Sequence, residues 1–252
     1  MIRIGVAGFG FVGQAVYKCI VNKEHPVEIY DPPRGYDSLE WITKCDVVFC
    51  CLPSPMNSDG SQNFSAYADF LGKMKESKFK GVLVVKSTVL YSSIQPFLKH
   101  LDIVMNPEFL NQNTAYEDFQ NQKVVVLGGR VDLCMKVAEV YQRYFTLNNP
   151  EFMYCTEKDA IEIKYIHNTY HAYKVLFWNY VGEVTKNHRK IFNAYSKITG
   201  NTHEMSNICS DGYPGYGGAC FPKDVKAINS ERPHVLTEFM INFNKKLRGN
   251  NE

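Results

Sequence analysis

The first 150 residues alternate short apolar runs with segments of helical spacing. Runs rich in Val, Ile and Phe predict strands, and apolar residues three and four positions apart predict helices. The predicted strands are 2–7, 27–30, 46–52, 82–86, 103–105 and 123–127, and the predicted helices are 12–22, 64–76 and 133–145. The run 46–52 is continuously apolar, which is typical of a strand buried on both faces. This alternation predicts an α/β fold built on a doubly wound, mostly parallel, Rossmann-like sheet.

The pattern changes near Cys155. Between residues 157 and 190 there is no proline, the only glycine is Gly182, and apolar residues recur at helical spacing. We predict one long helix here, with a kink near Gly182; at ~1.5 Å per residue it would extend well past one face of the sheet. A helix at 191–199, a glycine-rich loop and a short helical tail follow. We therefore expect two domains: 1–155, which binds a cofactor, and 156–252, which is α-helical with one long central helix.

Composition and charge exclude several classes of protein. The chain has 45% hydrophobic and 21% charged residues, as soluble globular proteins do. A net charge of +2 gives no support to nucleic-acid binding, and no apolar run approaches the ~20 residues of a membrane helix. The N-terminus has no signal-peptide pattern, so we predict a cytoplasmic protein with reduced thiols. His167 and His171 have the spacing of a helical zinc pair, but no third ligand is evident and we expect no metal.

A glycine-rich turn follows the first predicted strand and precedes the first predicted helix. In the G-x-G-x-x-G pattern the first glycine permits a tight turn, the second lets a pyrophosphate approach the helix N-terminus, and the third allows close packing. Asp31 ends the next strand, where a carboxylate accepts ribose hydroxyls and repels a 2′-phosphate. Arg34, nearby, is an argument for NADP. We predict that NAD binds at Gly8, Gly10, Phe11, Val12, Gly13 and Asp31.

A cysteine lies in a second glycine-rich segment, 215–224, which reads GYGGACFPKD. The glycines let backbone and substrate approach closely. Lys223 and a helix that starts after Pro222 would favour the thiolate of Cys220. Cys220 is therefore a candidate nucleophile, and together with the cofactor turn it suggests an oxidoreductase with a covalent intermediate. The other seven cysteines are predicted to be small buried residues, and they lie at 19, 45, 50, 51, 134, 155 and 209.

Four polar residues are ordinary when each is taken alone. Lys164 and Asn168 lie one turn apart and share a face of the long helix, which is also consistent with solvated surface residues. Glu108 and Thr88 follow strand ends, at the edge of a parallel sheet where ligands bind.

Together these residues make the chain resemble the UDP-glucose dehydrogenase family, which includes GDP-mannose and UDP-N-acetylhexosamine dehydrogenases. Six segments carry the resemblance, in order along the chain. They are Gly8 to Gly13, Cys51-Leu52-Pro53-Ser54-Pro55, Lys86-Ser87-Thr88-Val89, Asn106-Pro107-Glu108-Phe109-Leu110 with Thr114-Ala115 and Asp118-Phe119, Glu162 to Asn168, and Gly217 to Asp224. The family oxidises a sugar's primary alcohol to a carboxylate and reduces two NAD.

The resemblance implies a role for each candidate. Cys220 would be the nucleophile that forms a thiohemiacetal and then a thioester, while Lys164 and Asn168 would stabilise the oxyanion. Asp224 and Thr88 would hold the water, and Glu108 would be the general base or would orient that water. The resemblance adds Pro53, Ser54 and Thr88 to the cofactor residues. The implied substrate-binding residues are Glu108, Phe109, Leu110, Lys164, Asn168, Gly217 and Lys223.

The chain departs from the family in three places. Gln112 and Asn113 replace an acidic residue and a glycine, and Ala219 replaces a serine. The resemblance also stops before the third domain, which closes over the nucleotide, so we expect a reduced nucleotide-sugar site. Two alternatives therefore stay open, namely a catalytically weak NAD-binding or regulatory module, and one half of a split enzyme whose third domain is a separate chain. We also expect a homodimer through the long helix, as the family implies.

Overall fold

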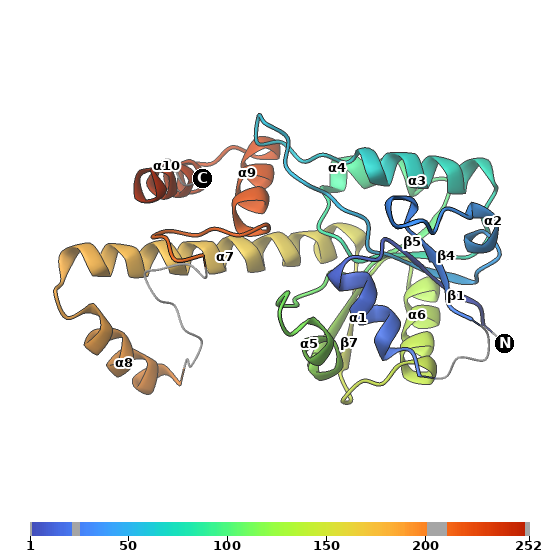
Figure 1. Cartoon of the computed structure of the whole chain (residues 1–252), viewed down its shortest axis with the longest axis horizontal. Coiled ribbons are helices and arrows are strands. Elements are labelled where there is room, and N and C mark those ends of the chain that lie inside the picture. Colours follow the sequence, from blue (N-terminus) through green and yellow to red (C-terminus); the bar gives the residue numbers. More distant parts are fainter. Residues whose placement is uncertain (1, 22–25, 201–210, 250–252) are drawn as a thin grey trace. The chain divides into compact units, whose positions relative to one another are not determined.

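The computed structural model describes residues 2–21, 26–200 and 211–249. The chain divides into two compact units. The first, here called the sheet unit, comprises Met1–Ser54 and Asn63–Lys164, and the second, the helical unit, comprises Pro55–Gln62 and Tyr165–Glu252 (Figure 1). This division falls inside a helix, whereas the domain boundary at residue 155 stays a prediction from the sequence.

The sheet unit is built on a sheet that has seven strands within the described residues. The strands are β1 Ile4–Ala7, β2 Glu28–Tyr30, β3 Val47–Cys50, β4 Val82–Val85, β5 Asp102–Met105, β6 Val124–Gly128 and β7 Glu151–Cys155, in the order β2-β1-β3-β4-β5-β6-β7. All neighbours pair in parallel except β5 and β6, which meet through the single antiparallel pair Met105 and Gly128. The predicted mostly parallel sheet is therefore confirmed. The pattern missed β7, an edge strand whose side chains are half-exposed or exposed.

Helices cover both faces of this sheet, as a doubly wound fold requires (Figure 1). One face carries α1 (Phe11–Cys19), α5 (Ala115–Asn121) and α6 (Val131–Tyr144), and the other carries α2 (Leu39–Ile42), α3 (Ser65–Glu76) and α4 (Tyr91–Ile94). Side chains alternate along a strand, so Val47 and Phe49 of β3 point to the same face and pack under α1 and α6. The Tyr67 hydroxyl of α3 donates to the Cys50 carbonyl of the same strand. The β3 strand is fully buried, as its continuous apolar run predicts.

The helical unit contains most of α7 (Glu157–Val184) together with α8 (His188–Thr199), α9 (Phe221–Glu231) and α10 (Val235–Arg248). The predicted long helix is confirmed, but its predicted end near residue 190 was wrong. The helix continues through Gly182 and ends at Val184, and residues 185–187 separate it from α8. The Thr185 hydroxyl accepts the Asn187 backbone N–H (3.3 Å), and such local bonds compete with helix continuation.

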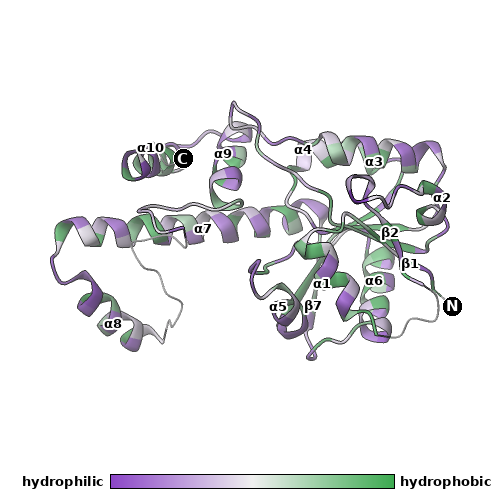
Figure 2. Cartoon of the chain, viewed as in Figure 1, coloured by the Kyte–Doolittle hydropathy of each residue, from purple (hydrophilic) through white to green (hydrophobic). Residues whose placement is uncertain are grey.

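The helical unit has a small apolar core and a broad exposed apolar surface. In its described part, the core cluster of buried residues contains Ala172, Leu176, Tyr216, Val225 and Met240. Along α7, hydrophobic and hydrophilic segments alternate over the whole length of the helix (Figure 2). Six large apolar residues of α7 stay exposed at spacings of three and four, which places them on one stripe: Ile166, Tyr170, Tyr173, Phe177, Tyr180 and Val184.

Candidate functional site

The glycine turn has the conformation that its sequence pattern predicts. Gly8 has φ +87°, and a Cβ on it would lie 2.5 Å from the Cys51 carbonyl oxygen. A Cβ on Gly13 would overlap the Gly8 carbonyl oxygen, whereas a Cβ on Gly10 would meet nothing within 4 Å. The first and third glycines are therefore required by the packing of the turn. The space beside Gly10 is what a pyrophosphate needs, and α1 begins at Phe11 with no side-chain cap on its N-terminus.

Asp31 lies beside this turn, after β2. Its Oδ2 accepts the backbone N–H of Phe9 (2.6 Å) and lies 3.6 Å from Nε of Arg34. Both contacts use the same oxygen, and the side chain is only 13% exposed. The carboxylate is thus held at the turn, close to where a ribose would follow a pyrophosphate, and the residues present fit a dinucleotide.

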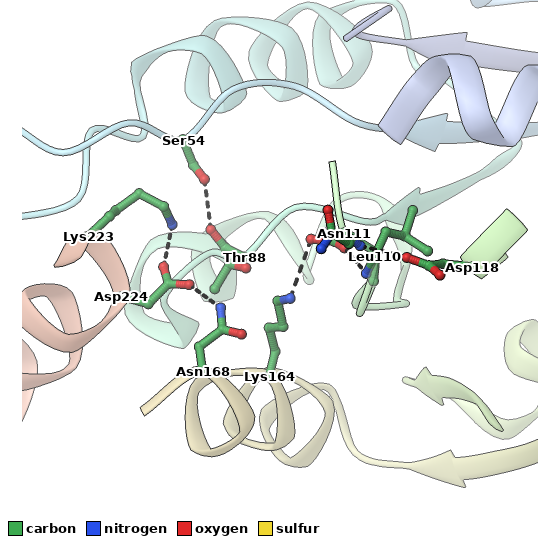
Figure 3. Close-up of polar contacts among 10 residues, drawn as sticks. Ser54, Thr88, Leu110, Asn111, Asp118, Lys164, Asn168, Lys223 and Asp224 are labelled. Carbon is green, nitrogen blue, oxygen red and sulfur yellow. Dashed lines mark hydrogen bonds and ion pairs between the residues drawn. The ribbon is translucent and has the colours of Figure 1, made fainter. Parts of the chain in front are cut away.

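The loops after β3 and β4 are joined by two hydroxyls. The Ser54 hydroxyl donates to the Thr88 carbonyl (2.8 Å) (Figure 3). The Ser87 hydroxyl donates to the Leu52 carbonyl (2.7 Å). Because β3 pairs with both β1 and β4, these loops lie at the same sheet edge as the glycine turn. The predicted cofactor residues of the sheet unit, Pro53 included, therefore follow the carboxyl ends of adjacent strands, where the strand order reverses.

Glu108 and Lys164 form a buried ion pair in the sheet unit. The Glu108 carboxylate follows β5, accepts the Leu110 backbone N–H (2.7 Å) and lies 3.4 Å from Lys164 Nζ. Lys164 Nζ is also 5.2 Å from the centre of the Phe109 ring. The side chains are 9% and 6% exposed, so each charge depends on its partner for stabilisation.

Lys86 is a buried cation that is not among the site residues predicted from the sequence. Its Nζ donates to Asn106 Oδ1 (2.9 Å), which also accepts the Tyr141 hydroxyl (2.5 Å). The pKa of Lys86 is lowered to about 8, mainly by burial; Cys51 and Glu108 act in the opposite direction, and Lys164 adds a smaller lowering effect. A lysine at the end of a buried strand, next to Ser87 and Thr88, was the signal available in the sequence.

A second polar cluster lies within the helical unit. Asn168 Nδ2 donates to Asp224 Oδ2 (2.5 Å), and Lys223 Nζ pairs with Asp224 Oδ1 (Figure 3). Asp224 is fully buried and Asn168 nearly so. The Asp224 backbone N–H donates to the Cys220 carbonyl (2.9 Å), which is the first hydrogen bond of α9. This cluster therefore connects one face of α7 to the residue that begins α9.

Cys220 differs from the other described cysteines in its surroundings. It is exposed and lies at the N-cap position of α9, which begins at Phe221 with Pro222 in its first turn, slightly earlier than the predicted start after Pro222. None of the seven described cysteines forms a disulfide, and Cys209 lies outside the described residues. Burial raises the pKa of Cys19, Cys45 and Cys51 to about 12, which makes these thiols poor nucleophiles.

The candidate residues thus fall into two groups, one in each unit. Thr88, Glu108 and Lys164 belong to the sheet unit, and Asn168, Cys220, Lys223, Asp224 and Gly217 belong to the helical unit. Lys164 and Asn168 are one turn apart on α7. His167 and His171 have ring centres 4.4 Å apart, and the described residues contain no group of three His, Cys, Asp or Glu that could hold a metal ion.

Two family models match this chain. The NAD binding domain of the UDP-glucose/GDP-mannose dehydrogenase family matches residues 36–145, and the central domain of that family matches residues 158–246. No helix within the described ranges is long and apolar enough to cross a membrane.

Among curated proteins, the chain is similar to two UDP-glucose 6-dehydrogenases. It is 27% identical over 281 residues to AglM of Haloferax volcanii, covering 90% of this chain and 64% of the relative. It is 28% identical over 229 residues to the enzyme of Rhizobium meliloti, covering 81% of this chain and 52% of the relative. The chain therefore spans about half to two thirds of the length of these relatives.

Solved structures share the fold. A UDP-glucose dehydrogenase of Pyrobaculum islandicum superposes with a TM-score of 0.81 at 21% identity, covering 98% of this chain and 68% of that one. The 3-hydroxyisobutyrate dehydrogenase of Mycobacterium tuberculosis superposes with a TM-score of 0.72 at 14% identity, covering 100% and 95%.

Proposed function

Because the chain belongs to the UDP-glucose/GDP-mannose dehydrogenase family, we propose that it oxidises the primary alcohol of a nucleotide sugar to a carboxylate. The sheet unit contains the family's NAD-binding domain. The observation that carries the proposal is the exposed Cys220 thiol at the N-cap position of α9, one helical turn before Asp224, whose buried carboxylate accepts a hydrogen bond from Asn168. Cysteines with a purely structural role are mostly buried.

The proposed reaction is two oxidations and one hydrolysis. When bound, NAD would supply the hydride acceptor for each oxidation. In the first, the alcohol loses a hydride from carbon and a proton from oxygen, and Glu108 is the base for that proton. The Cys220 thiolate then adds to the aldehyde carbon, and the C=O electron pair moves to the oxygen; loss of a second hydride from this alkoxide adduct restores the C=O bond as a thioester. Water breaks the C–S bond, which releases the carboxylate and restores the thiol.

The other residues would stabilise charge and orient groups in these steps. Lys164 and Asn168, one helical turn apart, would donate to the oxyanion that forms at the substrate carbon. Asp224 and Thr88 would hold the water that hydrolyses the thioester. Lys223, which already pairs with Asp224, would bind substrate together with Gly217, Phe109 and Leu110. In this scheme Asp31 binds the cofactor ribose through Oδ1, since Oδ2 makes both of its protein contacts.

The proposal includes a homodimer built on α7. The six exposed apolar residues of the stripe alternate by four and three, the spacing of a seam between two packed helices. Monomeric proteins rarely leave such a continuous apolar surface in water. A second copy of the chain would cover the stripe by two-fold symmetry. We also propose a cytoplasmic location, in keeping with thiols that form no disulfide among the described cysteines.

NADH formation by the purified chain against a panel of sugar nucleotides tests the proposed function. UDP-glucose, GDP-mannose and UDP-N-acetylhexosamines would each be offered with NAD. We expect two NADH for each carboxylate with one of them. If remote binding energy from a third domain is needed, activity should appear only when that domain is added as a separate chain. NAD binding without NADH formation under both conditions would favour the regulatory-module alternative.

A further inference from the structure

The last helix of the described chain, α10, carries two buried polar side chains. Asn244 is 2% exposed and Arg248 is 7% exposed, although the apolar core of the helical unit is small. Buried polar groups are stable only when they are hydrogen-bonded, so their partners show what they are for. In both cases the partners lie in the loop 211–219, which leads to Cys220.

Asn244 holds both backbone polar groups of one loop residue. Its Oδ1 accepts the Tyr216 N–H (2.8 Å), and its Nδ2 donates to the Tyr216 carbonyl (3.0 Å). The preceding residue, Gly215, donates its N–H to Asn179 of α7 (3.2 Å). Gly215 has φ +81°, and a Cβ there would overlap Asn244 Oδ1. The loop therefore approaches α10 so closely that only glycine fits.

Arg248 fixes the same loop one turn further along α10. Its Nη2 lies 2.5 Å from Oδ2 of Asp211, and its guanidinium is 5.8 Å from the centre of the Tyr213 ring. A Cβ on Gly217 would overlap Asp211 Oδ2 and lie 2.7 Å from Arg248 Nη1. The loop is thus held at residue 211 and at Tyr216, and Cys220 follows four residues after Tyr216.

We propose that Asn244 and Arg248 are positioning residues for Cys220. On the other side of Cys220 the chain is fixed because α9 begins there, with the Asp224 N–H bonded to the Cys220 carbonyl. Holding the loop at Tyr216 keeps the thiol at the start of α9, where a helix N-terminus favours the thiolate. The inference rests on the proposed role of Cys220 as nucleophile, and it makes α10 part of the machinery that prepares this thiol.

The test measures the reactivity of Cys220 directly. Iodoacetamide would be reacted with the whole purified chain over a range of pH, and modification of the Cys220 peptide would be followed by mass spectrometry, with Cys220→Ser as the blank. Asn244→Ala and Arg248→Met are the test variants. Asn242→Ala is the matched control, because Asn242 is exposed on the same helix.

We expect both test variants to react severalfold more slowly at neutral pH, with the midpoint of the pH profile moved upward, while Asn242→Ala behaves as wild type. In variants that turn over substrate, kcat should fall about 10- to 100-fold, the scale for a displaced reacting group, with the KM for NAD unchanged. Asn244→Asp keeps the acceptor for the Tyr216 N–H and should be intermediate. If Asn244→Ala does not fold, Asn244→Asp and Arg248→Met decide by the same measurement.

An unchanged alkylation profile in folded variants, even with a lower Tm, would overturn the proposal and leave α10 a purely structural role. This result does not depend on whether the chain oxidises a nucleotide sugar. Alkylation needs neither substrate nor turnover, so a chain that oxidises no sugar nucleotide can still show the shift.

Discussion

The two units of this chain present their candidate residues in different ways. In the sheet unit, Glu108, Lys164 and Lys86 are buried behind a large apolar core and held by one another or by Asn106. In the helical unit, Cys220 is exposed at the end of a glycine-rich loop, and the apolar core cluster found in the described part of that unit is small. The sheet unit thus has rigid support for cofactor chemistry. In the helical unit, side chains of α7 and α10 hold the loop before Cys220 by hydrogen bonds. In our proposal, a second copy of the chain also covers the exposed stripe of α7.

Among the variants, Cys220→Ser is expected to have the largest effect on turnover. Removal of a nucleophile lowers turnover by about three orders of magnitude or more, so carboxylate formation should be lost. NAD binding, which belongs to the sheet unit, should not change. Product analysis measures carboxylate formation, and a fluorescence titration measures cofactor binding. Cys155→Ser, a half-buried thiol in β7, is the control and should keep full activity. Full turnover by Cys220→Ser would exclude a covalent thioester.

The next largest effect is expected on self-association through the exposed apolar stripe of α7 in the helical unit. Tyr173→Glu with Phe177→Glu adds charge to the exposed stripe of α7 and should weaken self-association by about 30-fold or more per side chain, the scale of an interface hot spot. Sedimentation at micromolar concentration should show a wild-type dimer and a monomeric variant. Ile198→Glu, which changes an exposed apolar residue of α8 outside the stripe, is the control. A monomeric wild type at this concentration would contradict the dimer.

The sheet unit was largely predictable from the sequence and the helical unit was less so. Strands such as β3 and β4 are continuous apolar runs, and the glycine turn follows from steric rules at Gly8 and Gly13. The edge strand β7 was missed because its half-exposed residues lack that pattern. The end of α7 was misjudged because the helix stops at Val184, before a local bond between Thr185 and Asn187 that the apolar spacing does not reveal.

Long-range contacts were beyond a sequence pattern. Nothing in the local sequence of α10 indicates that Asn244 bonds Tyr216, 28 residues away, because a buried asparagine and an exposed one look alike in a helix. The same holds for Lys86 and Asn106, which directly follow the neighbouring strands β4 and β5 and meet only once the sheet forms. The sequence shows the two segments that contain Lys86 and Asn106, but it does not show that these side chains form a hydrogen bond.

A smaller effect would test the buried charge of the sheet unit. The folded pKa of Lys86, about 8, lies below its ordinary 10.5, so the unfolded chain binds more protons between these values. Stability from this group is therefore fully present above pH 10.5 and is lost as pH falls through 8. Lys86→Met should remove this dependence, which amounts to at most about 3 kcal/mol. Denaturant unfolding of both proteins across this range measures the difference. Parallel curves would mean that Lys86 keeps its ordinary pKa of 10.5 in the folded protein.

The smallest effect is expected at Asp31, where the sheet unit chooses its cofactor. The carboxylate bonds the Phe9 N–H and lies beside Arg34, so its charge opposes a 2′-phosphate while Arg34 favours one. Asp31→Asn keeps an acceptor for the Phe9 N–H and removes only the charge. Losing one charge-assisted hydrogen bond should narrow the preference for NAD over NADP by about tenfold. Titration of both cofactors measures this ratio, and Asp37→Asn, an exposed carboxylate nearby, should leave it unchanged. A wild type that binds NADP more tightly would show that Arg34 rather than Asp31 governs the site. Because either result concerns the sheet unit alone, it leaves the argument about Cys220 and its loop untouched.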